Sequence, residues 1–211
     1  MATPLASSPI EIKTPRVLIR LAVESDAAAF HQFLINPKNF PFQPTETDLT
    51  LERVIKRIGF FAKTAAEGKH AWVIFTSRET GEFLGYGGFN AFEEVEASEF
   101  LGKDASAGKK WMMDWGIMLD HTNWRKGYGL EIGIGLVEHA RGLGAELFRT
   151  ETDNDNEPWR LLMKALGVSD CEARGNASYD EKVEVWNWKW DLEKWEEAKG
   201  KLKAEGKWTG V

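Results

Sequence analysis

Residues 114–129 hold the groups with the clearest capacity for chemistry. This segment reads Asp114-Trp-Gly-Ile-Met-Leu-Asp-His-Thr-Asn-Trp-Arg-Lys-Gly-Tyr-Gly129. An apolar stretch suited to a strand runs into a short polar turn and then a basic, glycine-containing loop, after which a helical pattern begins. Backbone N–H groups in such a loop, at the N-terminus of the following helix, bind phosphate or pyrophosphate. The segment therefore predicts a site for a nucleotide-like cofactor.

The loop alone does not decide which cofactor this is. The P-loop pattern Gly-x4-Gly-Lys-Ser/Thr is absent, and so is the Gly-x-Gly-x-x-Gly turn of a Rossmann domain. Taken by itself, Gly127-x-Gly129 fits an ordinary helix N-terminus preceded by a flexible turn better than it fits a ligand-binding loop. A nucleotide-dependent transferase of another kind stays open at this point.

The composition is that of one globular domain: 211 residues, 43% hydrophobic and 28% charged. The single cysteine, Cys171, excludes a disulfide framework, and the four histidines are scattered without metal-ligand spacing, so we predict no metal. A net charge of −6 and a pI of about 5.4 argue against nucleic-acid binding and are compatible with a cationic substrate. We see no secretory signal and no membrane span, so we expect a cytoplasmic protein, either a monomer or a homodimer.

The elements that must position the loop follow from hydrophobic periodicity and from helix and turn signals. Strands are predicted at 14–21, 71–77, 83–92, 111–119, 145–153, 170–174 and 183–191. Helices are predicted at 25–35, 51–66, 130–141, 156–166 and 193–204. The proline-rich segment 36–48 and the polar segment 93–110 are expected to be loops, the second long and mobile. We expect a flexible leader at 1–13, one domain at 14–192 and a C-terminal helical extension at 193–211.

Four separated pieces of the sequence resemble the GNAT superfamily of N-acetyltransferases, in particular its RimJ/RimL-like branch. The pieces are Thr14-Pro-Arg-Val-Leu-Ile-Arg20 with Asp26, Asp114-Trp-Gly-Ile-Met-Leu119, Trp124-Arg-Lys-Gly-Tyr-Gly-Leu-Glu131, and Asn156 through Lys164-Ala-Leu-Gly167. Their order and spacing agree with the family over about residues 14–190. The third piece matches the family's Gln/Arg-x-x-Gly-x-Gly/Ala signature, with Trp124 in place of the first residue.

The resemblance implies an α/β (α+β) fold with a mixed, mostly antiparallel central sheet, splayed between its fourth and fifth strands and flanked by helices. It implies acetyl-CoA as co-substrate, with its pantetheine arm in the splay and Gly116 at a bulge of the fourth strand. Asn156 would bind this arm, although its position equally suits a helix cap. The implied cofactor-binding residues are Ile117, Met118, Leu119, Trp124, Arg125, Lys126, Gly127, Tyr128, Gly129 and Asn156.

The implied chemistry is attack of an amine on a thioester. A backbone N–H, of Met118 or Leu119, would polarise the carbonyl. Asp114 is the predicted base, acting directly or through water; the alternatives are that it orients the amine or forms a structural ion pair. Glu131 is expected to be structural. The position where the family often has a Ser or Tyr acid holds Trp159. Tyr128, Tyr179 or water could protonate the thiolate instead, so the acid is open.

The function implied is N-acetyltransfer to a primary amine by direct attack in a ternary complex. We favour a small molecule or amino acid as acceptor over a protein N-terminus. The predicted substrate-binding residues are Phe42, Asp114 and Trp188, although the tract Trp186-Asn-Trp-Lys-Trp190 fits a sheet face packed against helices better than a substrate wall. The alternative function is a catalytically weak, acyl-CoA-binding module that serves as a sensor or binds a partner.

Overall fold

The computed structural model describes residues 3–6, 10–102 and 108–210. An eight-stranded sheet runs through the molecule in the order β1-β2-β3-β4-β5-β6-β8-β7. The strands are β1 (Glu11–Lys13), β2 (Val17–Arg20), β3 (Ala71–Ser77), β4 (Phe83–Glu96), β5 (Lys109–Leu119), β6 (Leu147–Thr152), β7 (Glu172–Asn176) and β8 (Glu184–Asp191). The helices are α1 (Ala27–Leu34), α2 (Leu51–Glu67), α3 (Ala97–Leu101), α4 (Tyr128–Gly142), α5 (Glu157–Leu166) and α6 (Leu192–Ala204).

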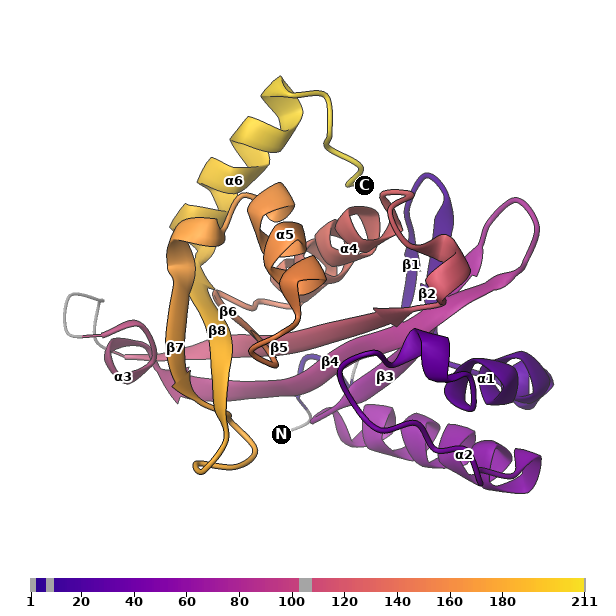
Figure 1. Ribbon diagram of the computed structural model, residues 1–211. Helices are drawn as coiled ribbons and strands as arrows, with labels where there is room; N and C mark the ends of the chain where they lie inside the picture. The colour runs from indigo at the N-terminus through magenta and orange to yellow at the C-terminus, as the bar shows by residue number, and fades with distance from the viewer. Residues whose placement is uncertain (1–2, 7–9, 103–107, 211) are drawn as a thin grey trace.

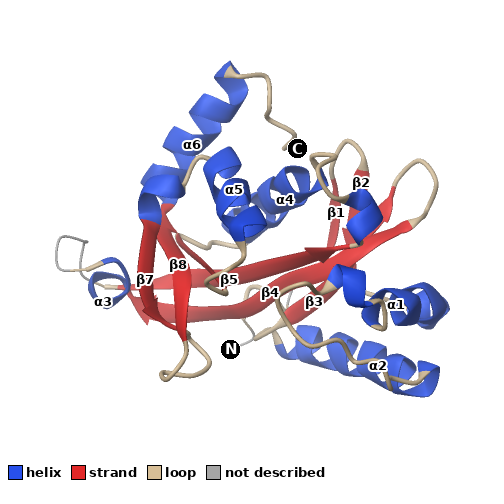
Figure 2. Ribbon diagram, in the orientation of Figure 1, coloured by secondary structure: helices blue, strands red, loops and turns tan. Residues whose placement is uncertain are grey.

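Helices cover both faces of the sheet (Figure 1). In that view α4, α5 and α6 lie above the sheet and α1 and α2 lie below it, and Figure 2 shows the same layers by secondary structure. We call the two sides the α4/α5 face and the α1/α2 face. Because side chains alternate along a strand, Trp115 and Ile117 of β5 join the main core on the α4/α5 face, whereas Asp114 and Met118 project from the α1/α2 face.

The sheet splits between β5 and β6, as predicted for the fourth and fifth strands of the sequence. These two strands are parallel and pair only from Met112–Asp114 to Leu147–Arg149, whereas every other neighbouring pair is antiparallel. Beyond Asp114, β5 stays paired with β4 as far as Leu119 and has no strand partner on its β6 side among the described residues. The mixed, mostly antiparallel sheet with a splay is therefore confirmed.

The two helices beside the split begin and end at residues suited to those positions. Asn156 caps α5 by accepting a hydrogen bond from Trp159 N at 3.2 Å, and Gly167 ends it in the left-handed conformation with φ of 90°. Gly127 precedes α4 with φ of 81°, a value that costs glycine nothing and an L-residue about 1 kcal/mol or more.

Four sequence-based expectations need correction. The predicted leader is too long, because Glu11–Lys13 pairs with β2 and Leu5 is buried in the main core. The predicted loop at 93–110 is partly a hairpin, in which β4 and β5 pair out to Glu96 and Lys109; residues 103–107 of that loop lie outside the described residues. The bulge lies in β4 at Asn90, between Phe89 and Ala91, whereas Gly116 pairs regularly with Gly88. The C-terminal helix is part of the core, where Trp195 is fully buried.

No helix in the described part of the chain has both the length and the apolar character needed to cross a bilayer.

Candidate functional site

The loop before α4 presents a row of unpaired backbone amides. The N–H groups from Arg125 to Leu130 donate to no acceptor among the described residues, and the first bond into the helix is Glu131 N to Gly127 O at 3.2 Å. Arg125 has φ of 58°, the single described non-glycine residue with a positive φ. Alternating left-handed residues turn successive N–H groups into one concavity, which binds anions together with the helix dipole. The predicted anion loop therefore has a suitable backbone conformation.

A buried carboxylate holds this loop in place. Glu131 is 1% exposed, and its Oε1 accepts from Thr14 Oγ1 at 2.6 Å and from Arg16 N at 2.7 Å. Its Oε2 accepts from Arg16 Nε at 2.7 Å, while Arg16 Nη1 donates to Lys126 O at 2.9 Å. The Arg16 guanidinium also lies 4.5 Å from the centre of the Tyr128 ring. Glu131 thus ties the start of β2 to the loop, in agreement with a structural role.

The edge of β5 that faces the split runs from the loop before α4 back to Asp114, where β5 and β6 separate; we call this point the apex of the split. Ile117 and Leu119 turn their backbone groups toward the split, whereas the backbone groups of Met118 between them face Tyr86 of β4. The exposed Trp124 donates from Nε1 to Leu119 O at 2.8 Å. Across the split, the side chain of Asn156 is already used twice, because Nδ2 also donates to Thr152 Oγ1 at 2.8 Å. This favours the cap over the pantetheine contact for Asn156, and the contact stays a prediction.

Trp159 lies behind the split and cannot be an acid. Its indole is 8% exposed and packs on Trp115 with ring centroids 5.6 Å apart, and an indole N–H does not ionise at useful pH. Neither ring nitrogen has a hydrogen-bond partner within the part of the chain that the structure describes. Of the tyrosines considered as substitutes, Tyr179 is 72% exposed; burial and then the nearby Asp153 and Glu151 raise its pKa.

Asp114 is engaged rather than free. Its Oδ2 accepts from Arg149 Nε at 2.5 Å and its Oδ1 from Asn90 Nδ2 at 2.9 Å. Burial raises the pKa of Asp114, against the lowering effect of the Arg149 charge and of both hydrogen bonds. These contacts favour the structural ion pair among the roles considered for Asp114, and its role as base stays a prediction.

Two charged residues of β6 were missed by the sequence reasoning. Arg149 pairs with Asp114 on the last rung before the strands separate, and Glu151 lies two residues further on the same face. Glu151 accepts from Ser178 N and Oγ, both at 3.0 Å, and lies 3.9 Å from Arg149 Nε. The signal was the alternation of charged Arg149 and Glu151 with Phe148 and Thr150 in a central strand, where charges are unusual.

The proline-rich segment reaches β5 from the α1/α2 face. Gln43 Nε2 lies 3.2 Å from Met118 Sδ, beside the half-exposed Phe42. A cavity of about 70 Å³ lies between the proline-rich segment and β5. It is lined by Leu34, Phe40, Gln43, Pro44, Thr45, Glu46, Tyr86 and Met118. Burial raises the pKa of Tyr86 to about 12, so this phenol stays neutral at physiological pH. The structure thus brings the proline-rich segment 36–48, which contains the predicted substrate-binding residue Phe42, next to Met118. We call it the acceptor segment.

Trp188 is not at this site. It lies on the α4/α5 face, fully buried in the main core with Trp190, whereas the acceptor segment lies across the sheet. Its predicted contact with substrate is therefore wrong, and the packed-face interpretation of the tryptophan tract holds for this residue.

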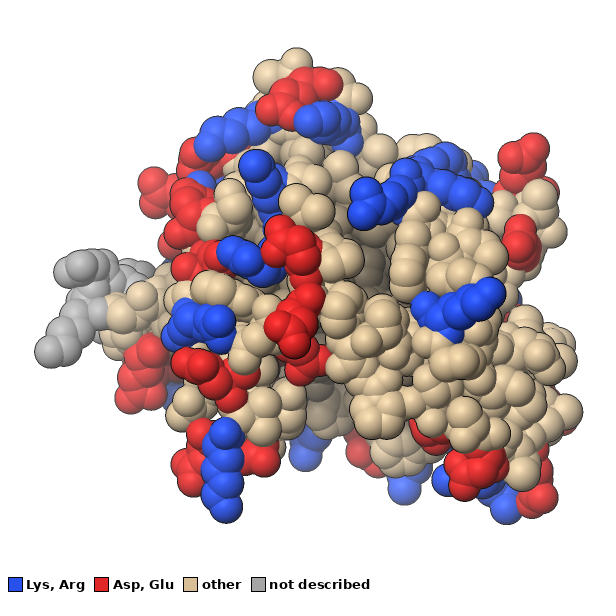
Figure 3. Space-filling view, in the orientation of Figure 1, with Lys and Arg blue, Asp and Glu red and all other residues tan. Residues whose placement is uncertain are grey.

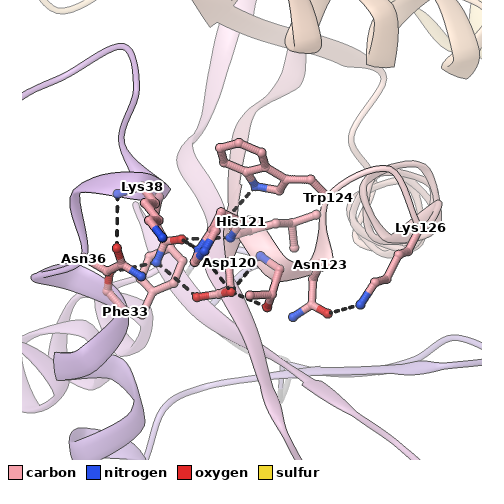
Figure 4. A network of polar contacts seen from close by, with 11 residues as sticks. Phe33, Asn36, Lys38, Asp120, His121, Asn123, Trp124 and Lys126 are labelled. Atoms are coloured by element: carbon pink, nitrogen blue, oxygen red, sulfur yellow. Dashed lines mark hydrogen bonds and ion pairs between the residues drawn. The ribbon is translucent and has the colours of Figure 1, made fainter.

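A polar network joins the acceptor segment to the cofactor loop (Figure 4). The buried Asn39 donates to Phe33 O at 3.0 Å and to Asp120 Oδ2 at 3.1 Å, and its Oδ1 accepts from His121 N at 2.8 Å. The same turn continues into Trp124 and into Lys126, whose Nζ lies 3.3 Å from Asn123 Oδ1. His121 is therefore part of this network between the two segments.

Charge is distributed unevenly around the split. In Figure 3, Lys and Arg side chains gather at the upper right, around the start of α4, while Asp and Glu side chains gather near the centre, in front of β6 and α5. Within the described residues, no group of three or more His, Cys, Asp or Glu side chains could hold a metal ion.

Comparisons with solved structures agree with this architecture. RimL, a ribosomal L7/L12 alpha-N-protein acetyltransferase in complex with coenzyme A, superposes with a TM-score of 0.64 at 16% identity, covering 87% of this chain and 99% of that chain. Mycobacterium smegmatis RimJ in complex with CoA-disulfide gives 0.66 at 12% identity over 100% of both chains. FdhC, a nucleotide-linked sugar GNAT, gives 0.65 at 15% identity over 96% of this chain and 100% of that chain. At such identities the likeness shows the fold.

A sheet split between β5 and β6, with unpaired amides of the loop before α4 at the mouth of the split, is the arrangement that the resemblance to acetyltransferases implies. The family model described as "Acetyltransferase (GNAT) domain" matches residues 16–169, most of the chain. The chain therefore belongs to the GNAT family of N-acetyltransferases, which use acetyl-CoA. No curated protein sequence matches it significantly.

Proposed function

We propose that this enzyme transfers the acetyl group of acetyl-CoA to a primary amine of a small molecule or amino acid, by direct attack in a ternary complex. The observation that carries the proposal is the row of unpaired amides from Arg125 to Leu130 at the mouth of the β5–β6 split. The loop conformation fits a pyrophosphate, and the open edge of β5 fits an extended arm that pairs as a strand would.

Bound acetyl-CoA supplies an acetyl thioester. Amides of residues 125–129, with the side chains of Trp124 and Tyr128 beside them, hold the pyrophosphate, and the backbone of Ile117 and Leu119 orients the arm. Of the two N–H groups predicted for the carbonyl, that of Leu119 polarises it, because the Leu119 backbone groups face the split whereas those of Met118 face Tyr86 of β4. The α4/α5 face behind the split is filled by Trp115 and Trp159, so the amine approaches from the α1/α2 face.

The small acceptor is favoured by the size and chemistry of the cavity beside Met118. Its apolar wall, formed by Leu34, Phe40 and Tyr86, suits an apolar or ring-bearing group. RimL is a ribosomal-protein acetyltransferase, whereas FdhC is a nucleotide-linked sugar GNAT. Because fold does not determine the acceptor, neither of them assigns an acceptor to this chain.

The test is a panel of amines, amino acids and peptides incubated with acetyl-CoA, with release of free thiol as the readout. Turnover with small amines and none with peptides supports the proposal, and peptide-only turnover moves the acceptor to a protein N-terminus. Binding of CoA, measured by calorimetry, without thiol release from any acceptor favours the alternative of an acyl-CoA-binding module. Titration with ATP and NAD in place of acetyl-CoA tests for another nucleotide-dependent transferase.

A further inference from the structure

Two oppositely charged side chains stand at the apex of the split, on the face from which the amine approaches. Arg149 and Glu151 are two residues apart on β6, and 3.9 Å separates Arg149 Nε from Glu151 Oε1. Arg149 lies opposite Asp114 on the last β5–β6 rung, so the pair stands where the split begins.

Two of the three guanidinium nitrogens of Arg149 are available to bind a ligand. Its Nε is used by Asp114 at 2.5 Å, but neither Nη1 nor Nη2 donates to an acceptor within the described part of the chain. Neither nitrogen is among the fully buried atoms without partners, so both reach solvent. A guanidinium with two free terminal nitrogens is suited to grip a carboxylate.

A second cation stands beside Arg149. Lys189 of β8 lies directly opposite Arg149 in the antiparallel register, which brings their Cβ atoms to about 5 Å. Burial, and then the charge of Arg149, lowers the pKa of Lys189. Asp114 and Glu151 together balance the charges of Arg149 and Lys189, so the group of four side chains suits a ligand that carries one negative and one positive charge.

Glu151 is the complementary anion. Its carboxylate accepts from Ser178 N and Oγ and has no cation closer than Arg149 at 3.9 Å among the described residues. Its side chain is 12% exposed, so an ammonium group can reach it and be partly desolvated there.

We propose that the acceptor is a free α-amino acid, with its carboxylate bound by Arg149 and Lys189 and its amino group received by Glu151. This rests on the acetyltransferase function proposed above. The amine and carboxylate of an α-amino acid are attached to one carbon, a spacing that matches the close Arg149–Glu151 pair. An amine without this carboxylate makes no contact with the terminal nitrogens of Arg149, and a peptide N-terminus offers them only a neutral carbonyl.

The experiment compares four acceptors that share one ring: phenylalanine, phenylalaninamide, phenethylamine and a tripeptide that begins with phenylalanine. We expect the kcat/KM of phenylalanine to exceed that of the other three by about tenfold or more, as expected from one charge-assisted contact. Equal values for phenylalanine, its amide and phenethylamine overturn the inference while leaving acetyl transfer intact. A higher value for the tripeptide overturns it in favour of a peptide N-terminus.

Variants assign the preference to these residues. Lys189→Gln is on the surface, and Arg149→Lys keeps a positive charge beside Asp114, so neither leaves a buried carboxylate alone. Both lower the ratio of phenylalanine to phenethylamine turnover, whereas the control Lys63→Gln, on exposed α2 surface, leaves it unchanged. Glu151→Gln, which can still accept from Ser178, raises the KM of all four acceptors. An unchanged ratio in both cation variants rejects the site.

Binding separates this inference from the proposed function. If no acceptor releases thiol, acetyl transfer fails, and calorimetric titration of phenylalanine and phenethylamine into the protein saturated with CoA tests the amino-acid site alone. Heat from phenylalanine only, reduced in Arg149→Lys, supports the site. Equal heats from both ligands, or none from either, overturn it.

Discussion

The cofactor side and the acceptor side of the split are built by different means. On the cofactor side, backbone amides of one loop do the binding, and a single buried carboxylate, Glu131, keeps the loop in shape. On the acceptor side, the available groups are side chains of β4, β5, β6 and β8 and of the proline-rich segment. Backbone binding fixes one ligand for a whole family, while side-chain binding lets the acceptor change between members.

The largest expected effect comes from a substitution on the cofactor side that disturbs the loop before α4. Glu131→Gln replaces the Oε2 that accepts from Arg16 Nε with an amide donor, and so leaves a donor unpaired at a buried position. We expect a loss of about 1–3 kcal/mol in the free energy of unfolding and weaker CoA binding. Urea unfolding and calorimetry measure these, with the exposed Glu52→Gln as control. Unchanged stability would show that Glu131 does not hold the loop.

A second change strains the loop itself. Gly127→Val places a β-branched residue at φ of 81°, which costs about 1–2 kcal/mol if the conformation is kept. We expect about tenfold weaker CoA binding because the amides no longer converge. Gly142→Ala is the matched control, since a Cβ there meets nothing within 4 Å. Full CoA affinity in Gly127→Val would contradict an amide-built site.

A third change tests whether the acceptor side holds the base. If Asp114 positions Arg149, Asp114→Asn lowers kcat/KM by about tenfold and leaves the shape of the pH–kcat profile unchanged. Loss of the acidic limb of that profile would instead identify Asp114 as the base. Asn90→Ala, which removes the other contact of Asp114 without removing an ionisable group, is the comparison variant.

The smallest expected effect concerns the junction between the two sides. Burial opposes ionisation of Asp120, yet hydrogen bonds from Thr122 and Asn39 and the charge of His121 lower its pKa below 3.8. The contribution to stability is therefore present above about pH 4 and is lost as the pH falls through the lowered pKa. Asp120→Asn should cost about 0.5–1 kcal/mol at pH 7, and the cost should shrink as the pH falls below 4, measured by thermal unfolding across pH. If the stability difference between wild type and Asp120→Asn grew as the pH fell, the predicted direction of the pH dependence would be wrong.

The difference between the sides also explains what could be predicted from sequence. The loop was predictable because its glycines, its basic residues and the helix that follows lie within one short segment. The split in the sheet was implied by the family resemblance. It is confirmed by the pairing of β5 with β6, which stops at Asp114 and Arg149. The Asp114–Arg149 pair was beyond reach, because the two residues are 35 positions apart and meet only through strand pairing.

Trp188 shows the converse error. Indole spacing on one strand predicts a shared face but cannot tell which face is covered by helices. The bulge at Asn90 was equally hidden, because no glycine marks it and its visible effect is to aim Asn90 at Asp114.

The tilted pair of indoles Trp115–Trp159 gives this molecule an intrinsic optical probe. The two indoles lie 5.6 Å apart at 48°, one on β5 and the other on α5, so their excited states couple only while strand and helix keep their places on either side of the split. Near-ultraviolet circular dichroism should carry a signal from this pair that Trp159→Phe removes. Ligand entry between β5 and α5 can then be followed in solution without a label, before any acceptor is known.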